Sequence, residues 1–403
     1  MTGIPARQDN GQKGTDFKSV PARNKALFAI FACIAMYGFT LGLGRPLLAL
    51  ILESRGIDRS IIGLNAAMPA IGIFLSTPFI PMLVEKLGMR RFLVLVLMLD
   101  LVVLLQFPRF DHLYAWFFLG IFLGAMTNCL LVTSETWINE IVDDANRGRL
   151  MGLYNALLAA TMAMGPLVIP AVGIQGWAPF LVGACFIALA ALPLIWTGPH
   201  RLSTHDQPSF NIISFLWVAP TLVAAVLLFS LKETAGNALL PVYGTRSGMS
   251  EAGAAIMLTV IGVGGVTLSY PMGWLADRYN RYGLLVFCGV CGLAGAVLLP
   301  YAMESRWLLY PLLFGWGGVF AGMYTAVLTI IGQHFRGRDL VTANVSLGML
   351  WGVGSLIWPP VTGVAMDIRD PGGFPLVFIT VALVFVLFAS GRWLLSRDKS
   401  AVL

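Results

Sequence analysis

Charged residues are scarce in this chain: Asp, Glu, Lys and Arg make up only 11% of its 403 residues. Because soluble globular proteins carry about 25% charged residues, this composition cannot cover a surface that faces water. The sequence also lacks the patterns G-x-x-x-x-G-K, G-x-S-x-G and H-E-x-x-H, and its four histidines are scattered near predicted loops. These absences argue against direct use of ATP and leave an enzyme without a catalytic motif.

Hydrophobic residues are abundant instead, at 58% of the chain. A membrane-spanning helix needs about 20 apolar residues, and this supply suits roughly twelve of them. The 44 glycines and 22 prolines agree, since membrane helices tolerate both residues better than soluble helices do. We therefore predict an all-α membrane protein with twelve transmembrane helices. The predicted spans are 26–52, 61–84, 92–108, 114–139, 148–172, 177–197, 212–242, 251–274, 284–302, 307–333, 340–366 and 375–395.

Lys and Arg residues are unevenly distributed across the predicted membrane. If both termini are cytoplasmic, the inside segments hold 18 of these residues and the outside loops hold 6. By the positive-inside rule, this excess predicts cytoplasmic termini. It also accounts for the net charge of +6 without a nucleic-acid partner. We expect a monomeric, multi-pass protein of the cell inner membrane, in contact with the lipid bilayer.

All five cysteines fall within predicted spans. Cys288 and Cys291 have the C-x-x-C spacing of redox and metal sites, but they lie in an apolar helix without a nearby histidine. Such a pair is more often two small packing residues. We assign no disulfide, no metal and no cofactor.

Polar segments divide the chain into two parts of similar hydropathy. Residues 1–25 lack the apolar core of a signal peptide and are predicted to form a disordered cytoplasmic tail. Residues 198–211 are predicted to be a central cytoplasmic linker, and residues 396–403 a second cytoplasmic tail. Between them lie two predicted halves of six spans each, 26–197 and 212–395.

The two halves also repeat one another. Six residues recur 189 positions later: Arg147, Gly148, Arg149, Asn155, Gly165 and Pro170 as Arg336, Gly337, Arg338, Asn344, Gly354 and Pro359. A second correspondence aligns Pro81–Arg91 with Gly273–Gly283, at an offset of 192. Two pseudo-symmetric six-helix repeats around a central cleft are typical of secondary transporters.

At these residues the sequence resembles the major facilitator superfamily, whose signature between spans two and three reads approximately G-x-L-A-D-R-x-G-R-R. The second-half copy is the better match, with Gly273, Leu275, Ala276, Asp277, Arg278 and Arg281. The first-half copy has Pro81 for Gly, Glu85 for Asp and Lys86 for Arg, and keeps Gly88, Arg90 and Arg91. The resemblance covers residues 26–395 and implies the major facilitator fold, with alternating access between the two halves. The gating residues that we expect are Glu85, Arg90, Arg149, Asp277, Arg278, Arg281 and Arg338.

Two further stretches refine this resemblance. The segment Ser134–Glu140, followed by Arg147–Arg149, resembles a poorly characterised bacterial branch that is usually grouped with sugar or drug transporters. Gly152, followed later by Gly165-Pro166, is similar to the proton-antiporter signature G-x8-G-x3-G-P-x2-G-G. Thr161 replaces the middle glycine of that signature, so the match favours efflux without settling the direction.

Five ionisable residues lie well inside the predicted spans: Arg45, Asp100, Glu135, Lys232 and Glu233. Each costs about 2.5–3.5 kcal/mol on insertion scales, so each needs a partner or a watery cavity. Their formal sum is −1, and burial favours protonation of an unbalanced carboxylate. This predicts proton coupling, with Glu233 and Glu135 as candidate carriers. For Asp100 we favour a buried partnership with a neighbouring span over a proton role.

Arg45 in the first span and the Lys232–Glu233 pair in the seventh are candidate substrate-binding residues, since the resemblance implies that both spans line the cavity. We expect Glu233 to face Arg45 across the cleft, which leaves Lys232 free for an anionic group. Neighbours in sequence point about 100° apart on an α-helix, so Lys232 and Glu233 are not expected to neutralise one another. The alternative is a purely structural Arg45–Glu233 pair.

In the fourth span, Asn128, Glu135 and Asn139 form one polar stripe. Glu135 is either a protonatable group in the cavity or a structural partner of Arg90 or Arg149. Other candidate binding residues are Asn128 on this stripe and the aromatic residues Tyr37, Tyr324 and Trp351, which offer ring faces to an amphipathic substrate.

These residues together predict a proton-driven secondary transporter that exports an amphipathic or anionic small molecule. Two alternatives remain open at this point. One is proton-coupled import of a small organic acid or sugar, and the other is a membrane receptor or assembly factor that does not transport.

Overall fold

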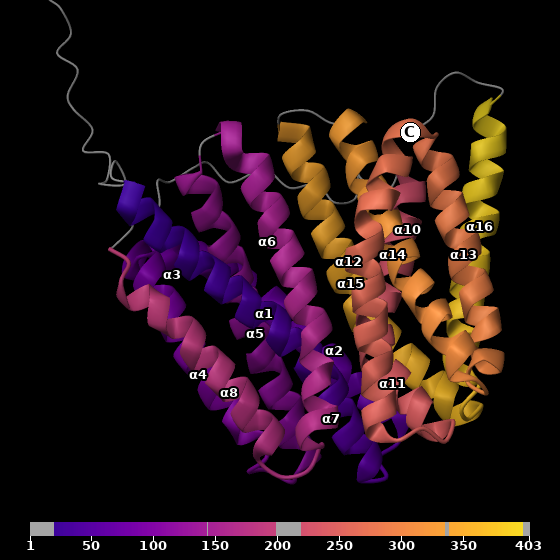
Figure 1. Ribbon diagram of the computed structural model, residues 1–403, viewed down its shortest axis with the longest axis horizontal. Helices are drawn as coiled ribbons and strands as arrows, with labels where there is room; N and C mark the ends of the chain where they lie inside the picture. Colours follow the sequence, from indigo (N-terminus) through magenta and orange to yellow (C-terminus); the bar gives the residue numbers. More distant parts are fainter. Residues whose placement is uncertain (1–19, 143, 199–218, 335–337, 398–403) are drawn as a thin grey trace, which may run out of the picture.

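The structure is a computed structural model that describes residues 20–142, 144–198, 219–334 and 338–397. These ranges are helical throughout their regular parts (Figure 1). The first group of elements is α1 (Val20–Ser54), α2 (Arg59–Ser76), η1 (Thr77–Phe79), α3 (Ile80–Leu87), α4 (Met89–Gln106), α5 (Leu113–Ile141), α6 (Asp144–Met164), η2 (Gly165–Leu167), α7 (Val168–Val172) and α8 (Ala178–Ile195). The second group is α10 (Pro220–Leu231), η3 (Lys232–Gly236), α11 (Asn237–Arg246), α12 (Glu251–Arg278), α13 (Arg281–Ala302), α14 (Arg306–His334), α15 (Arg338–Ile368) and α16 (Gly373–Arg397).

The prediction of an all-helical membrane protein is confirmed. Within the described residues, eleven helical segments are long and apolar enough to cross a membrane. The remaining predicted span corresponds to α4, whose 18 residues include Arg90, Arg91 and Asp100. Its composition alone therefore does not mark it as a membrane helix. Ten of the other predicted spans coincide with one of the eleven segments to within a few residues. The span predicted over 212–242 corresponds to Pro220–Arg246, and most of its predicted first two turns lies outside the described residues.

Three of the predicted spans are interrupted. The span over 61–84 breaks at η1 and the span over 148–172 breaks at η2, and both breaks carry proline in their first turn. Proline lacks the amide hydrogen that an α-helix needs and clashes with the preceding turn. The third interruption, η3, is a π-helix inside the span that starts at α10. Such π segments occur frequently at functional sites.

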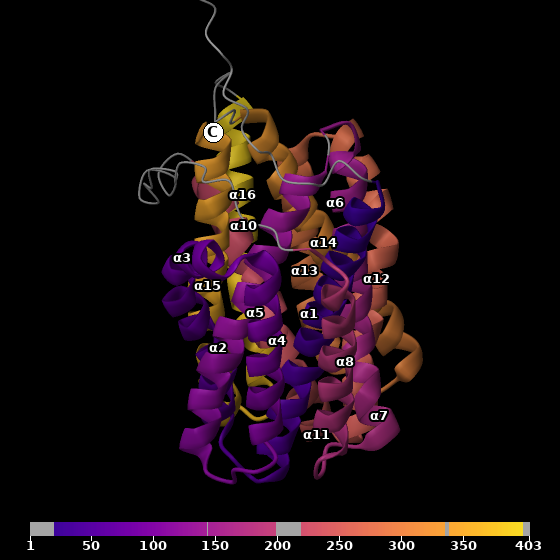
Figure 2. The ribbon, with the colours of Figure 1, turned by 90° about the vertical axis from the view of Figure 1, so that its left-hand side faces the viewer.

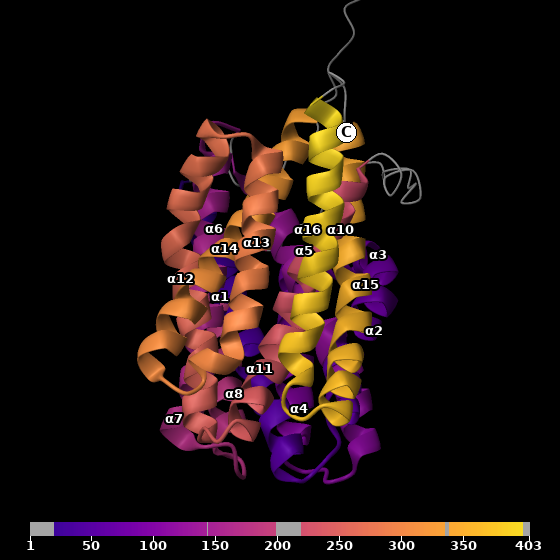
Figure 3. The same cartoon turned by 90° about the vertical axis from the view of Figure 1, so that its right-hand side faces the viewer.

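Figure 1 shows α1 to α8 on one side of the molecule and α10 to α16 on the other, here called the N-terminal and C-terminal groups. Helix packing between the groups involves α2 with α15, α1 with α11, and α6 with α12. The start of α1 and the end of α16 lie at the same end of the molecule, here called the terminal end (Figures 1, 2 and 3). The helix α1 begins at Val20, earlier than the predicted boundary at residue 26. The rest of that predicted tail, most of the predicted linker and most of the C-terminal tail lie outside the described residues.

Glycines let the two groups touch through their backbones. A Cβ atom added to Gly63 of α2 would lie 2.1 Å from the carbonyl oxygen of Pro359 in α15. A Cβ atom on Gly262 of α12 would lie 2.5 Å from the Cβ of Ala163 in α6. Neither site has room for a side chain, so these close approaches depend on glycine.

Candidate functional site

A polar cluster lies where the two groups meet. Arg45 of α1 donates a hydrogen bond from Nη1 to the backbone carbonyl oxygen of Glu233, at 2.7 Å. The guanidinium carbon of Arg45 also lies 6.0 Å from the ring centre of Trp351 in α15, at the limit of a cation–π contact. Residues that are far apart in the sequence therefore gather as predicted, but Arg45 contacts the backbone of Glu233 and not its carboxylate.

The π-helix η3 brings Lys232 and Glu233 together. Lys232 Nζ lies 2.5 Å from Glu233 Oε1, and both side chains are largely buried. Asn237, one turn further on, donates from Nδ2 to the backbone oxygen of Glu233 at 2.8 Å. The prediction that Lys232 stays free for an anion is therefore wrong. The long lysine stem reaches around the widened π turn, and the low dielectric strengthens the resulting ion pair.

Glu135 of α5 is electrostatically coupled to tyrosines of three other helices. It interacts electrostatically with Tyr37 of α1, Tyr154 of α6 and Tyr324 of α14. Its half-buried carboxylate makes no ion pair with a described arginine. Arg90 instead donates to the carbonyl oxygens of Ile195 and Thr197. The structural alternative, in which Glu135 binds Arg90 or Arg149, is therefore not what the structure shows.

Aromatic rings form the apolar part of this cluster. Tyr324 stacks on Phe229 of α10, with ring centres 4.7 Å apart, and Tyr324 is 39% exposed. The predicted residues Tyr37, Tyr324 and Trp351 thus lie close to the charged groups. Phe229 and Tyr154 belong to the same cluster and were missed, because a single aromatic residue in an apolar span carries no distinguishing signal.

A small cavity adjoins Arg45 between α1, α2 and α5. Its volume is about 50 Å³ and its lining includes Thr40, Arg45, Asn65 and Thr127, which is room for water. The Nδ2 atom of Asn65 is buried and has no hydrogen-bond partner among the described residues. The sequence analysis did not single out Asn65, because only the fold brings this polar residue next to Arg45.

Asn128 and Asp100, two polar residues of the predicted spans, are not part of the cluster around Arg45. Asn128 donates from Nδ2 to Ser76 Oγ and Thr77 Oγ1, each at 3.0 Å, and so joins α5 to the break between α2 and η1. Its amide hydrogens are used in contacts between helices and not in binding a ligand. Asp100 of α4 is 1% exposed, and neither carboxylate oxygen has a hydrogen-bond partner among the described residues. Among the described residues, the buried partner that was predicted for Asp100 is therefore absent.

The predicted gating residues lie at the terminal end, and three of them, Arg90, Arg278 and Arg281, contact residues of their own group. Besides Arg90, Arg278 lies 4.4 Å from the ring centre of Trp274 in its own helix. Arg281 of α13 donates to Gln333 Oε1 of α14. Glu85 is exposed to solvent.

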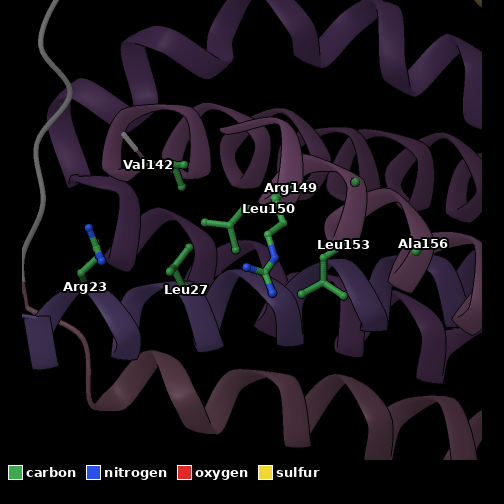
Figure 4. A pocket seen from close by; sticks show the side chains of 8 residues that line it. Arg23, Leu27, Val142, Arg149, Leu150, Leu153 and Ala156 are labelled. Atoms are coloured by element: carbon green, nitrogen blue, oxygen red, sulfur yellow. The ribbon is translucent and has the colours of Figure 1, made fainter. Parts of the chain in front are cut away.

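Three further gating candidates complete the set. Arg149 lies beside a groove formed by α1 and α6 (Figure 4). Asp277 and Arg338 belong to α12 and α15, but their side chains lie outside what the structure describes. In this conformation, these contacts of Arg90, Arg278 and Arg281 therefore do not join the two groups at the terminal end.

The opposite end of the molecule carries an ion network between the groups, formed by Glu53, Arg59, Arg246, Asp367 and Asp370 and here called the outer network. Arg59 Nη2 lies 2.9 Å from Asp370 Oδ2. Arg246 forms an ion pair with Asp370, and its Nε atom lies 3.6 Å from Glu53 Oε1. These contacts connect α1 and α2 of one group with α11 and the segment just after α15 of the other.

Asp367 has a specific role in the outer network. Its carboxylate oxygens accept the backbone N–H groups of Arg59 at 3.0 Å and Ser60 at 2.9 Å. A carboxylate from the end of α15 thus caps the start of α2, where two amide groups have no partner within the helix. The N-cap residue Asp58 makes no side-chain capping bond of its own. This network was also missed, because charges at span ends show no pairing in the sequence.

Comparison with known proteins identifies the family. A family model described as Major Facilitator Superfamily matches residues 30–359 and 222–402. The chain belongs to the major facilitator superfamily. It is 26% identical to the uncharacterized MFS-type transporter YfkF of Bacillus subtilis (strain 168), over 91% of this chain and 95% of that protein. It is 27% identical to an uncharacterized MFS-type transporter of Yersinia pestis (strain Pestoides F), over 60% and 63% of the two chains.

Solved structures agree on the fold. A mutant form of the nucleoside transporter NupG superposes with a TM-score of 0.77 at 13% identity, covering 92% of this chain and 99% of that one. A bacterial homolog to the human lysosomal transporter Spinster, in an inward-facing and occupied conformation, gives 0.75 at 13% identity, over 94% and 98%. This superfamily member is thus a multi-pass secondary transporter of a small molecule and not an enzyme, and the interpretation as a receptor or assembly factor is set aside.

Proposed function

We propose that this transporter exports an amphipathic or anionic small molecule in exchange for protons, by alternating access between the N-terminal and C-terminal groups. The observation that carries the proposal is the cluster around Arg45, Glu135 and Glu233. It is built from α1, α5, α14, α15 and η3, so a substrate bound there contacts both groups. Movement of one group against the other then changes the substrate's surroundings, as coupled transport requires.

The charge of the cluster favours an anion. Lys232 and Glu233 neutralise one another at 2.5 Å, which leaves the positive charge of Arg45 beside the cavity that holds Asn65. A guanidinium binds carboxylate and sulfonate groups with paired hydrogen bonds. The rings of Trp351 and Tyr324 lie on the same cluster and suit an apolar body. The substrate class is therefore an organic anion with an aromatic or aliphatic part.

The two candidate proton carriers differ in their surroundings. Glu233 is engaged by Lys232 and lies 3.5 Å through Oε2 from Asn237, so protonation would break an existing ion pair. Glu135 has no such pair among the described residues and interacts electrostatically with three tyrosines. Burial without a counter-charge favours the neutral carboxylic acid. We therefore assign proton coupling to Glu135, with Glu233 holding Lys232 in place.

The two ends of the molecule have complementary gates in this proposal. The outer network joins the two groups here, so the present conformation is closed at that end and open toward the terminal end. In the opposite conformation the outer network separates, and the loop motif with Asp277, Arg278 and Arg281 closes the terminal end together with Glu85, Arg90, Arg149 and Arg338. The two pseudo-symmetric six-helix halves, the cytoplasmic termini, the inner-membrane location and the monomer remain part of this proposal.

Thermal stabilisation of the purified transporter tests the binding site. A ligand at 100 times its dissociation constant stabilises the folded state by about 2.7 kcal/mol. We expect amphipathic sulfonates or carboxylates to raise the melting temperature of the wild type and to lose that effect in Arg45→Gln. Equal stabilisation by neutral sugars, with no dependence on Arg45, would instead favour the importer of a sugar.

A further inference from the structure

A second groove lies away from the central cluster, between the start of α1, the end of α5 and the first turns of α6 (Figure 4). Its volume is about 730 Å³. The wall is mainly apolar and includes Leu27, Leu150, Leu153 and Ala156, and the groove is also lined by Arg23 and Arg149. Two cations over an apolar wall match a molecule with an anionic head and a hydrocarbon body.

The position of the groove fits the edge of a bilayer. Arg23 lies in the first turn of α1 and Arg149 in the second turn of α6, and mainly apolar residues follow each of them along its helix; both arginines thus lie near the ends of their helices. Leu153 and Ala156 follow Arg149 at one and two turns along α6. The apolar wall therefore leads from the two guanidinium groups toward the centre of the membrane.

The described part of the chain leaves this wall exposed. Leu153 is 55% exposed, and Gly152 and Ala156 are also exposed. In Figure 4 the Arg149 guanidinium lies between Leu27 of α1 and Leu153 of α6. An acyl chain covers such a surface in a membrane, and a guanidinium group binds a phosphate with charge-assisted hydrogen bonds. A zwitterionic headgroup carries its own ammonium and complements the exposed Arg149 less well.

We propose that this groove is a binding site for an anionic phospholipid of the leaflet at the terminal end. The phosphate group lies at Arg23 and Arg149, and one acyl chain follows Leu27, Leu153 and Ala156. Basic pockets between transmembrane helices bind anionic headgroups in this manner. The assignment does not depend on which solute is transported. It gives Arg149 a role in lipid binding in addition to its predicted role in gating.

Native mass spectrometry of the full chain tests the proposal by counting bound lipids after exchange into phosphatidylglycerol or phosphatidylcholine. We expect the wild type to retain phosphatidylglycerol preferentially. Arg149→Gln should weaken this retention about fivefold, the effect of removing one basic residue near an anionic headgroup. Ala156→Trp keeps both charges but blocks the acyl path, and should weaken it as well. Arg91→Gln is the matched control, since Arg91 is also exposed at a helix start but lies outside the groove.

Three outcomes overturn the proposal. Equal losses in Arg149→Gln and Arg91→Gln mean that attraction to anionic lipid is general. Full competition by glycerol 3-phosphate, with no effect of Ala156→Trp, means that the groove takes a free phosphate and not a lipid. Equal retention of phosphatidylcholine means that the arginines do not select the headgroup. Because Ala156 and Arg149 are both exposed, we expect each variant to fold, and its monodispersity confirms this before lipid is counted.

Discussion

Asp367→Ala is the most informative change in the outer network, because this carboxylate caps α2 from the opposite group. The substitution removes the acceptors of the Arg59 and Ser60 amides, and loss of an N-cap costs about 1 kcal/mol. It also removes the pair between Asp367 and Arg59 at 3.6 Å, which contributes about 0.4 kcal/mol at a partly exposed site. The sum, about 1.4 kcal/mol, corresponds to a tenfold shift toward the conformation that is open at the outer end.

Spin-label distances measure this shift directly. Labels at Asp111, just before α5, and Ser305, just before α14, report the separation of the groups at the outer end in a variant without native cysteines. We expect the longer distance to gain population about tenfold relative to the shorter one. Asp58→Ala is the matched control, since Asp58 is the N-cap residue of the same helix but makes no capping bond. The reasoning is refuted if both variants shift equally or if Asp367→Ala does not shift.

The remaining predictions concern coupling and closure. Glu135→Gln should abolish flux driven by a pH gradient while solute exchange continues, and undiminished gradient-driven flux in liposomes rules it out as the carrier. Glu233→Gln should leave Lys232 unpaired and lower the stability of the protein by about 3–5 kcal/mol, the usual cost of breaking a buried ion pair; an unchanged melting temperature contradicts that role. Arg45→Gln should weaken binding of anionic ligands at least tenfold and neutral ones much less, as measured by thermal shift. Gly63→Leu should keep the outer end open, because its side chain would collide with Pro359; unaltered label distances count against close packing there.

Much of the fold follows from the sequence because the membrane requires it. Every backbone polar group in the hydrocarbon must be bonded internally, so long apolar runs become helices with predictable ends. The gathering of Arg45, Glu233 and Trp351 was predictable in part, since intramembrane charges need partners. Which groups pair with one another was not predictable, because the pairing depends on the π-helix at Lys232–Gly236. The hydrophobic periodicity of the sequence does not indicate a π-helix there.

Contacts between distant surfaces were less predictable still. Asp367 and Arg59 are separated by most of the chain, and only the packing of α15 on α2 brings them together. Glu135 shows the same limit, because the sequence placed it near Arg90 in depth but could not show that Arg90 turns to the carbonyl groups at the end of α8. The conformation also matters, since contacts between the gating residues of the two groups at the terminal end form only when that end is closed.

Proton movement in proteoliposomes tests the central claim most directly. Aromatic sulfonates serve as probes because they stay charged and do not cross the bilayer as neutral acids. An imposed gradient of a sulfonate that stabilises the protein should drive protons in the opposite direction, read by a trapped pH dye, in wild type but not in Glu135→Gln. Sulfonate flux without proton movement, or equal proton movement in both proteins, would contradict the account.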